Sequence, residues 1–122
     1  MVELAVTSVA RLTDTIDTHR EAFDKEGLSH VWPKIVSVVT QPGVDFSHTA
    51  IHRFEPNKAR DLSAAVKAIE NMTFEAHSTD YQPTESLAEL VKQHFFFLKV
   101  GPELTFRTVS YTHLTLPTIL RV

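Results

Sequence analysis

The sequence has no cysteine, which excludes both a disulfide framework and a thiolate metal site. Only three of its 122 residues are glycine, and they form no glycine-rich loop of the kind that holds nucleotide phosphates. No apolar run approaches the roughly 18 residues of a membrane span. There is also no basic run, and the net charge is −3. These features argue against a membrane protein and against a nucleic-acid partner, which normally requires a stripe of Lys and Arg.

What is present is typical of a soluble α/β protein. Hydrophobic residues make up 43% of the chain and charged residues 22%. The length suits one domain or a piece of one. Residues 1–6 lack the basic stretch and long apolar core of a signal peptide, so we expect a cytoplasmic location.

Three amphipathic helices are predicted from apolar residues that recur every three or four positions. The first covers residues 8–26, with Thr7 or Ser8 as its N-cap. The second begins at Pro56, and the third follows Pro83. The apolar positions of the three helices are Val9, Leu12, Ile16 and Phe23; Ala59, Leu62, Val66 and Ile69; and Leu87, Leu90 and Val91.

Three short apolar segments alternate with these helices, at residues 35–39, 72–76 and 95–100. The first is a nearly continuous β-branched run, which is typical of a parallel strand covered on both faces. The order helix, strand, helix, strand, helix, strand predicts right-handed crossovers and a parallel sheet. We therefore predict an α/β fold in one domain.

The helical pattern stops after Phe106, although the third strand should be followed by a helix that covers it. Residues 109–118 are rich in threonine, show no apolar stripe and include Pro117. They resemble one translated frame of a transposon-type sequencing adapter. We expect residues 1–108 to belong to one domain and residues 109–122 to be a non-native tail. The alternative is a genuine β-hairpin at this end.

The loops that follow the strands are where parallel α/β proteins carry their function. These loops are residues 41–46, 75–82 and 99–105. The second places an acid, an imidazole, two hydroxyls and another acid within six residues, a set that can bind a metal, relay a proton or hydrogen-bond a sugar. The candidates for substrate or phosphate binding are Gln41, Gly43, Glu75, His77, Ser78, Asp80, Lys99 and Gly101.

Several of these candidates have structural alternatives. Ser78, Thr79 and Asp80 can instead cap the next helix. Lys99 can pair with a neighbouring acid instead of contacting a phosphate or carbonyl group. Gly101, which precedes a proline, can simply terminate the strand.

Histidines supply the candidate metal ligands. His77 directly follows a buried strand and is the one we assign as a candidate ligand. Glu75, inside the predicted strand, needs a partner if it is buried. His48 and His52 are four positions apart, which suits a metal pair only if their loop is helical. No apolar stripe supports a helix there.

Three longer motifs carry a family resemblance. Residues 39–46 (VTQPGVDF), 74–82 (FEAHSTDYQ) and 98–106 (LKVGPELTF) occur in this order. Together they resemble the Z-type accessory subunit of D-tagatose-1,6-bisphosphate aldolase. The resemblance covers roughly residues 3–107.

The resemblance implies a TIM-like (β/α)8 barrel of the class II aldolase type, to which this chain would contribute strands six to eight. It implies an accessory, non-catalytic subunit that supports the activity and stability of a catalytic aldolase subunit. The pathway would be the catabolism of galactitol or N-acetylgalactosamine. The implied partners are that catalytic subunit and a phosphosugar, and the implied cofactor of the parent complex is a divalent metal such as zinc. Catalytic relatives hold a histidine ligand in the loop that corresponds to His77.

An alternative reading is that the barrel itself is a metal-dependent, phosphosugar-binding enzyme of the aldolase type. Some members carry an older label, tagatose-6-phosphate kinase. The absence of a glycine-rich nucleotide loop argues against the kinase reading. In either reading we expect this chain, without the first five strands, to be inactive by itself.

Overall fold

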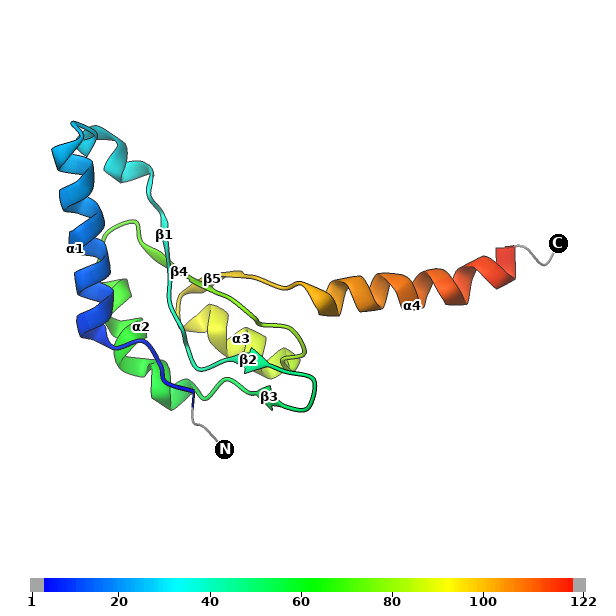
Figure 1. Ribbon diagram of the computed structural model, residues 1–122. Coiled ribbons are helices and arrows are strands. Elements are labelled where there is room, and N and C mark those ends of the chain that lie inside the picture. Colours follow the sequence, from blue (N-terminus) through cyan, green and yellow to red (C-terminus); the bar gives the residue numbers. More distant parts are fainter. Residues whose placement is uncertain (1–3, 120–122) are drawn as a thin grey trace.

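The computed structural model describes residues 4–119, with side chains as far as residue 112 (Figure 1). Helices and strands alternate in the predicted order, and short 3-10 helices (η) accompany them. The elements are α1 (Val9–Lys25), η1 (Ser29–Lys34), β1 (Ser37–Val39), β2 (Asp45–Phe46), β3 (Ile51–His52), η2 (Pro56–Ala59), α2 (Arg60–Lys67), β4 (Thr73–Ala76), α3 (Thr84–Lys92), β5 (Phe95–Leu98) and α4 (Pro102–Ile119).

The strands β1, β4 and β5 form a parallel sheet in that order. Each neighbouring pair is connected by a crossover that contains a helix, α2 between β1 and β4 and α3 between β4 and β5. Glu75 in the central strand pairs with Val39 of β1 and with Phe97 of β5. The prediction of a mixed α/β fold with a parallel sheet is confirmed.

Helix α1 begins and ends as its sequence predicts. The Ser8 hydroxyl accepts the backbone N–H of Arg11 at 3.2 Å, which satisfies one of the free donors of the first turn. At the other end Gly27 adopts a φ of +69°, a conformation that side chains disfavour. The buried residues of this helix are Leu12 and Ile16.

The core lies between one face of the sheet and the helices. Phe74 and Phe95, from adjacent strands, are fully buried, and their ring centroids are 4.8 Å apart. Leu12 from α1, Leu62 and Val66 from α2 and Leu90 from α3 complete the same cluster. Burying a side chain of this size contributes about 1.5–3 kcal/mol. This cluster is therefore what fixes the helices on the sheet.

The opposite face of the sheet is open. Val39 is 52% exposed and Phe97 is 46% exposed, and they flank Glu75 in one row across the three strands. The apolar composition of residues 35–39 predicted a strand covered on both faces, but the described residues cover only one face of the sheet. Val91 is likewise 47% exposed, although the sequence placed it on the buried face of its helix with Leu90.

Helix α4 corrects the prediction that the helical pattern ends at Phe106. It continues to Ile119, and the Thr108 and Thr112 hydroxyls donate to carbonyl groups one turn earlier. Figure 1 shows this helix extending away from the sheet. Leu104 and Phe106 are 58% and 65% exposed, so the part of the helix with described side chains, residues 102–112, has no apolar stripe against the core. The prediction relied on apolar periodicity, which detects helices that pack against a core. Helix α4 is held by hydrogen bonds within the helix, and these leave no apolar pattern in the sequence. Across residues 4–119, no helix is both long and apolar enough to cross a membrane.

Candidate functional site at the strand ends

The candidate residues of β4 and β5 meet at the carboxyl ends of these strands. The Lys99 N–H donates to the Ala76 carbonyl at 2.8 Å, which brings the two strand ends together. The side chains of Glu75, His77 and Lys99 then form one cluster. His77 Nε2 lies 2.8 Å from Glu75 Oε1, and Lys99 Nζ lies 3.4 Å from the same oxygen.

Electrostatics in this cluster favour an ionised carboxylate. The hydrogen bond from His77 lowers the pKa of Glu75, and the positive charge of Lys99 lowers it further, while loss of hydration acts in the opposite direction. Glu75 is part-buried, and its carboxylate has these two partners. The side chains of His77 and Lys99 are 57% and 62% exposed, so both can reach a ligand above the sheet.

Asp80 is a structural residue in this arrangement. Its side chain is buried, and Oδ1 accepts the backbone N–H groups of Gly101 at 2.8 Å and of Glu103 at 2.9 Å. It therefore caps α4 rather than the next helix, α3, which has Pro83 at its N-cap position and no side-chain cap hydrogen bond. An aspartate at this position also interacts favourably with the helix dipole.

The neighbours of Asp80 hold the two loops together. The Thr79 hydroxyl and its N–H both contact the Lys99 carbonyl, at 3.0 and 3.1 Å. Ser78 has a φ of +56°, and Tyr81 has a φ of +62°. This strained turn places Asp80 and Thr79 toward the protein and leaves His77 and Tyr81 exposed.

Gln41 and Gly43 shape the loop after β1. Gln41 Oε1 accepts the N–H groups of Gly43 and Val44, both at 2.9 Å, and the Gln41 N–H donates to the Thr7 hydroxyl at 2.8 Å. Gly43 has a φ of +96°, and a Cβ there would contact Val6 at 3.4 Å. The side-chain amide of Gln41 is thus used to hold its own loop in place.

The metal ligands present do not amount to a complete site. His77 and Glu75 are adjacent, but in the described part of the chain no group of three His, Asp or Glu side chains surrounds a common point. Catalytic zinc sites use three protein ligands. His48 and His52 belong to a β-hairpin, so the helical spacing that a metal pair would need is absent.

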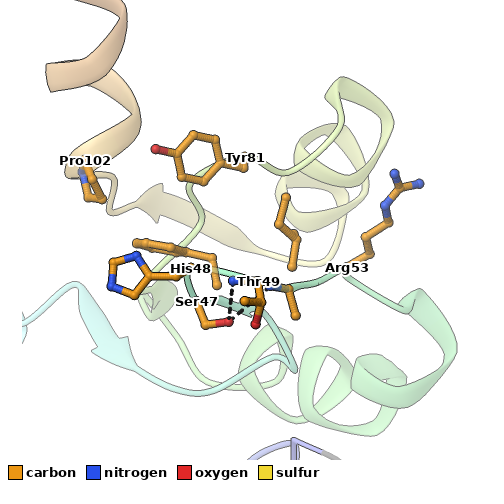
Figure 2. A pocket seen from close by; sticks show the side chains of 9 residues that line it. Ser47, His48, Thr49, Arg53, Tyr81 and Pro102 are labelled. Atoms are coloured by element: carbon orange, nitrogen blue, oxygen red, sulfur yellow. Dashed lines mark hydrogen bonds between the residues drawn. The ribbon is translucent and has the colours of Figure 1, made fainter. Parts of the chain in front are cut away.

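That hairpin, β2 and β3, was not predicted from the sequence, and it lines a pocket of about 810 Å³ beside the strand ends (Figure 2). The pocket is also lined by Tyr81 from the loop after β4 and by Pro102 at the start of α4. Polar side chains of the hairpin, Ser47, His48, Thr49 and Arg53, face it. Tyr81 lay within a motif that the sequence singled out, but no sequence pattern indicated Arg53.

Fold and site together define a parallel α/β protein whose candidate functional groups gather at the carboxyl ends of the strands. The chain belongs to the family described as D-tagatose-1,6-bisphosphate aldolase subunit GatZ/KbaZ-like, whose model matches residues 1–112. It is similar to the crystal structure of a protein from Sinorhizobium meliloti 1021 described as a probable tagatose 6 phosphate kinase, with 42% identity and a TM-score of 0.81. The similarity covers 86% of this chain and 27% of that one, so the chain spans about a quarter of that relative. The family resemblance seen in the three motifs is confirmed.

Proposed function

We propose that the full-length protein represented by this chain is an accessory, non-catalytic subunit of tagatose-bisphosphate aldolase. The observation that carries the proposal is the family match over residues 1–112. In this role the subunit binds a catalytic partner and increases its activity and stability.

We further propose that β1, β4 and β5 are strands six to eight of a (β/α)8 barrel. Among the described residues, both outer strands of the sheet have an unpaired edge, and the row of Val39, Glu75 and Phe97 lies on an open face. In a closed barrel that face points inward and is filled by side chains of the other strands. The coverage of only 27% of the related structure supports the same reading. Residues 1–108 then belong to the barrel.

A second candidate function is an enzyme of the aldolase type that binds metal and phosphosugar itself. The cluster of Glu75, His77 and Lys99 favours it, because an acid, an imidazole and an amine at the ends of parallel strands suit proton transfer and phosphate binding. Further metal ligands would have to come from the part of the protein outside this chain. A kinase activity has less support, since the glycines at 27, 43 and 101 are too far apart to form a nucleotide loop.

Reconstitution of the aldolase separates the two functions. The full-length protein, its catalytic partner, and a mixture of both are each supplied with D-tagatose 1,6-bisphosphate and a divalent metal, and triose phosphate release is recorded. We expect the mixture to exceed the partner alone, and the full-length protein alone to release nothing. Release by the full-length protein alone would contradict the accessory role and support the second candidate. The galactitol or N-acetylgalactosamine pathway is a further proposal, which the genomic neighbourhood of the full-length gene tests.

A further inference from the structure

The β2–β3 hairpin stands apart from the parallel sheet and forms a two-stranded sheet of its own. It lies within residues 40–55, a connection between β1 and η2 that is far longer than the roughly two to six residues that usually join a strand to the next helix. Buried Gln82 holds the hairpin in place, since its side chain accepts the Phe54 N–H at 3.1 Å and donates to the His52 carbonyl at 2.8 Å. Long loops held on a rigid scaffold are common sites of binding.

One face of the hairpin, together with the loop after β4, presents aromatic, apolar and basic side chains. Phe46 and Ile51 are cross-strand partners in the β2–β3 ladder, and the Tyr81 ring packs edge to face on Phe46 with centroids 5.6 Å apart. Arg53, two positions after Ile51, lines the same pocket as these three residues. We call Phe46, Ile51, Arg53 and Tyr81 the hairpin face.

The composition of this pocket is typical of the centre of a protein–protein interface. Among the described residues, those that line it include two aromatic rings and an arginine but no Lys, Asp or Glu. Interface centres are enriched in Tyr, Phe and Arg and depleted in Lys, Asp and Glu. Ile51 and Tyr81 are 45% and 38% exposed, so the pocket is an open depression, whereas a small ligand is usually held in a cleft that buries most of its surface. The hairpin face therefore suits a partner protein.

The guanidinium group of Arg53 indicates the chemistry of that partner. In the part of the chain that the structure describes, no hydrogen bond, ion pair or ring contact involves the Arg53 side chain, and Figure 2 shows it extending away from the other labelled residues. An exposed arginine is ordinary on a protein surface, but Arg53 shares its pocket with exposed Ile51 and Tyr81. A planar guanidinium group binds a carboxylate at two oxygens. Charge complementarity thus calls for a carboxylate beside apolar side chains.

We propose that the hairpin face is a docking surface for the catalytic aldolase subunit, at a part of that subunit that presents a carboxylate beside apolar side chains. Arg53 binds the carboxylate, and Ile51 and Tyr81 pack on the apolar groups. This inference rests on the proposed accessory function, which supplies the partner, and it adds where on this chain the partner docks and by which contacts.

Calorimetric titration of the full-length protein with its catalytic partner tests the proposal. We expect Arg53→Gln to weaken binding about tenfold or more and to reduce the dependence of the Kd on salt, because salt screens the ion pair that it removes. Arg53→Lys keeps the charge without the planar fork and should lose less affinity. Ile51→Ser should also weaken binding. Thermal unfolding of each variant should match the wild type, since both side chains are exposed.

Two matched controls lie away from the hairpin. Arg11→Gln removes another exposed arginine, on α1. Val91→Ser, on α3, removes an apolar side chain that is 47% exposed, close to the 45% of Ile51. Because neither residue belongs to the hairpin face, we expect both variants to keep the wild-type Kd within about twofold.

Three results would overturn the docking surface while leaving the accessory role intact, provided that the wild-type protein binds and activates its partner. The first is partner binding that neither Arg53→Gln nor Ile51→Ser weakens. The second is an Arg53→Gln variant whose Kd depends on salt as steeply as that of the wild type, which would refute the carboxylate contact. The third is self-association of the full-length protein that Arg53→Gln abolishes without affecting partner binding, which would assign the face to a second copy. A wild-type protein that neither binds nor activates the partner would instead refute the accessory role, and this proposal with it.

Discussion

The buried carboxylate of Asp80 accepts the backbone N–H of Gly101 at 2.8 Å, although 21 positions separate the two residues. The same oxygen accepts the N–H of Glu103, and the Glu103 carboxylate in turn accepts the N–H of Tyr81 at 2.6 Å. The loop after β4 and the start of α4 are therefore joined in both directions. This junction fixes the turn from which His77 and Tyr81 project.

Replacing Asp80 should destabilise the protein. Asp80→Ala removes the acceptor of two backbone N–H groups at the start of α4, and we expect a loss of about 0.5–2 kcal/mol in the unfolding free energy, as for other helix caps. Asp80→Asn retains one acceptor oxygen and should lose less. Urea denaturation of the full-length protein measures both variants. Asp17→Ala, an exposed position on α1, is the control and should change stability by less than about 0.5 kcal/mol. An Asp80→Ala variant as stable as this control would remove the capping role.

Removing the imidazole at position 77 should affect function more than folding. His77 is exposed at the strand end and hydrogen-bonds Glu75, so we expect His77→Ala in the full-length protein to weaken either phosphosugar binding or partner activation at least tenfold, about 1.4 kcal/mol. Calorimetry and the reconstituted aldolase assay measure these two quantities. His30→Ala, an exposed position in η1, is the matched control. Wild-type values in both assays would show that His77 only orders the loop.

The Glu75 carboxylate should make stability depend on pH in acid. Its pKa is lowered in the folded protein, mainly by the His77 hydrogen bond, so its contribution is complete above the unfolded pKa of about 4.3 and is lost as the pH falls through the lower folded value. Glu75→Gln should therefore flatten the decline of unfolding free energy below about pH 4.3. Denaturation at a series of pH values measures this slope, with Glu70→Gln as an exposed control. Equal slopes in wild type and Glu75→Gln would be inconsistent with a lowered pKa.

The sequence predicted the elements whose signal is local. The Leu12 and Ile16 spacing with a Ser8 cap specified α1, and the apolar segments specified β1, β4 and β5 because each strand packs at least one apolar side chain against the core. The β2–β3 hairpin escaped prediction because its strands have two residues each, too few for an alternating pattern.

Several residue roles in the candidate site depend on long-range contacts and could not be predicted from the sequence. Spacing showed that Ser78, Thr79 and Asp80 suit a cap, but not that Asp80 caps α4, which begins at Pro102. Gln82 is the last residue of the motif at residues 74–82. Its role depends on hydrogen bonds to the backbone of Phe54 and His52, which only folding brings close to it. Arg53 has no local pattern at all, and only the pocket identifies it.

The tail prediction concerns residues 109–122. The family match ends at residue 112, and the described part of α4 makes few contacts with the rest of the chain, since Val109 and Tyr111 are 48% and 70% exposed. We expect the genomic locus, read without added adapters, to encode a different sequence from about residue 109. A full-length protein in which the natural helix replaces this segment should be at least as stable. A locus that encodes residues 109–118 as they stand here would refute the prediction.

The central claim is that this chain is an incomplete part of a larger barrel. An open sheet face and two unpaired strand edges leave apolar surface and backbone groups in water. At about 25 cal/mol per Å² of apolar surface, a few hundred Å² left exposed forfeits about 5–10 kcal/mol, comparable with the stability of a whole domain. The direct measurement is to purify the 122-residue chain and record its elution volume and thermal transition. We predict aggregates or an unfolded elution profile without a sharp transition. A monomeric peak that unfolds in one cooperative transition would contradict the claim.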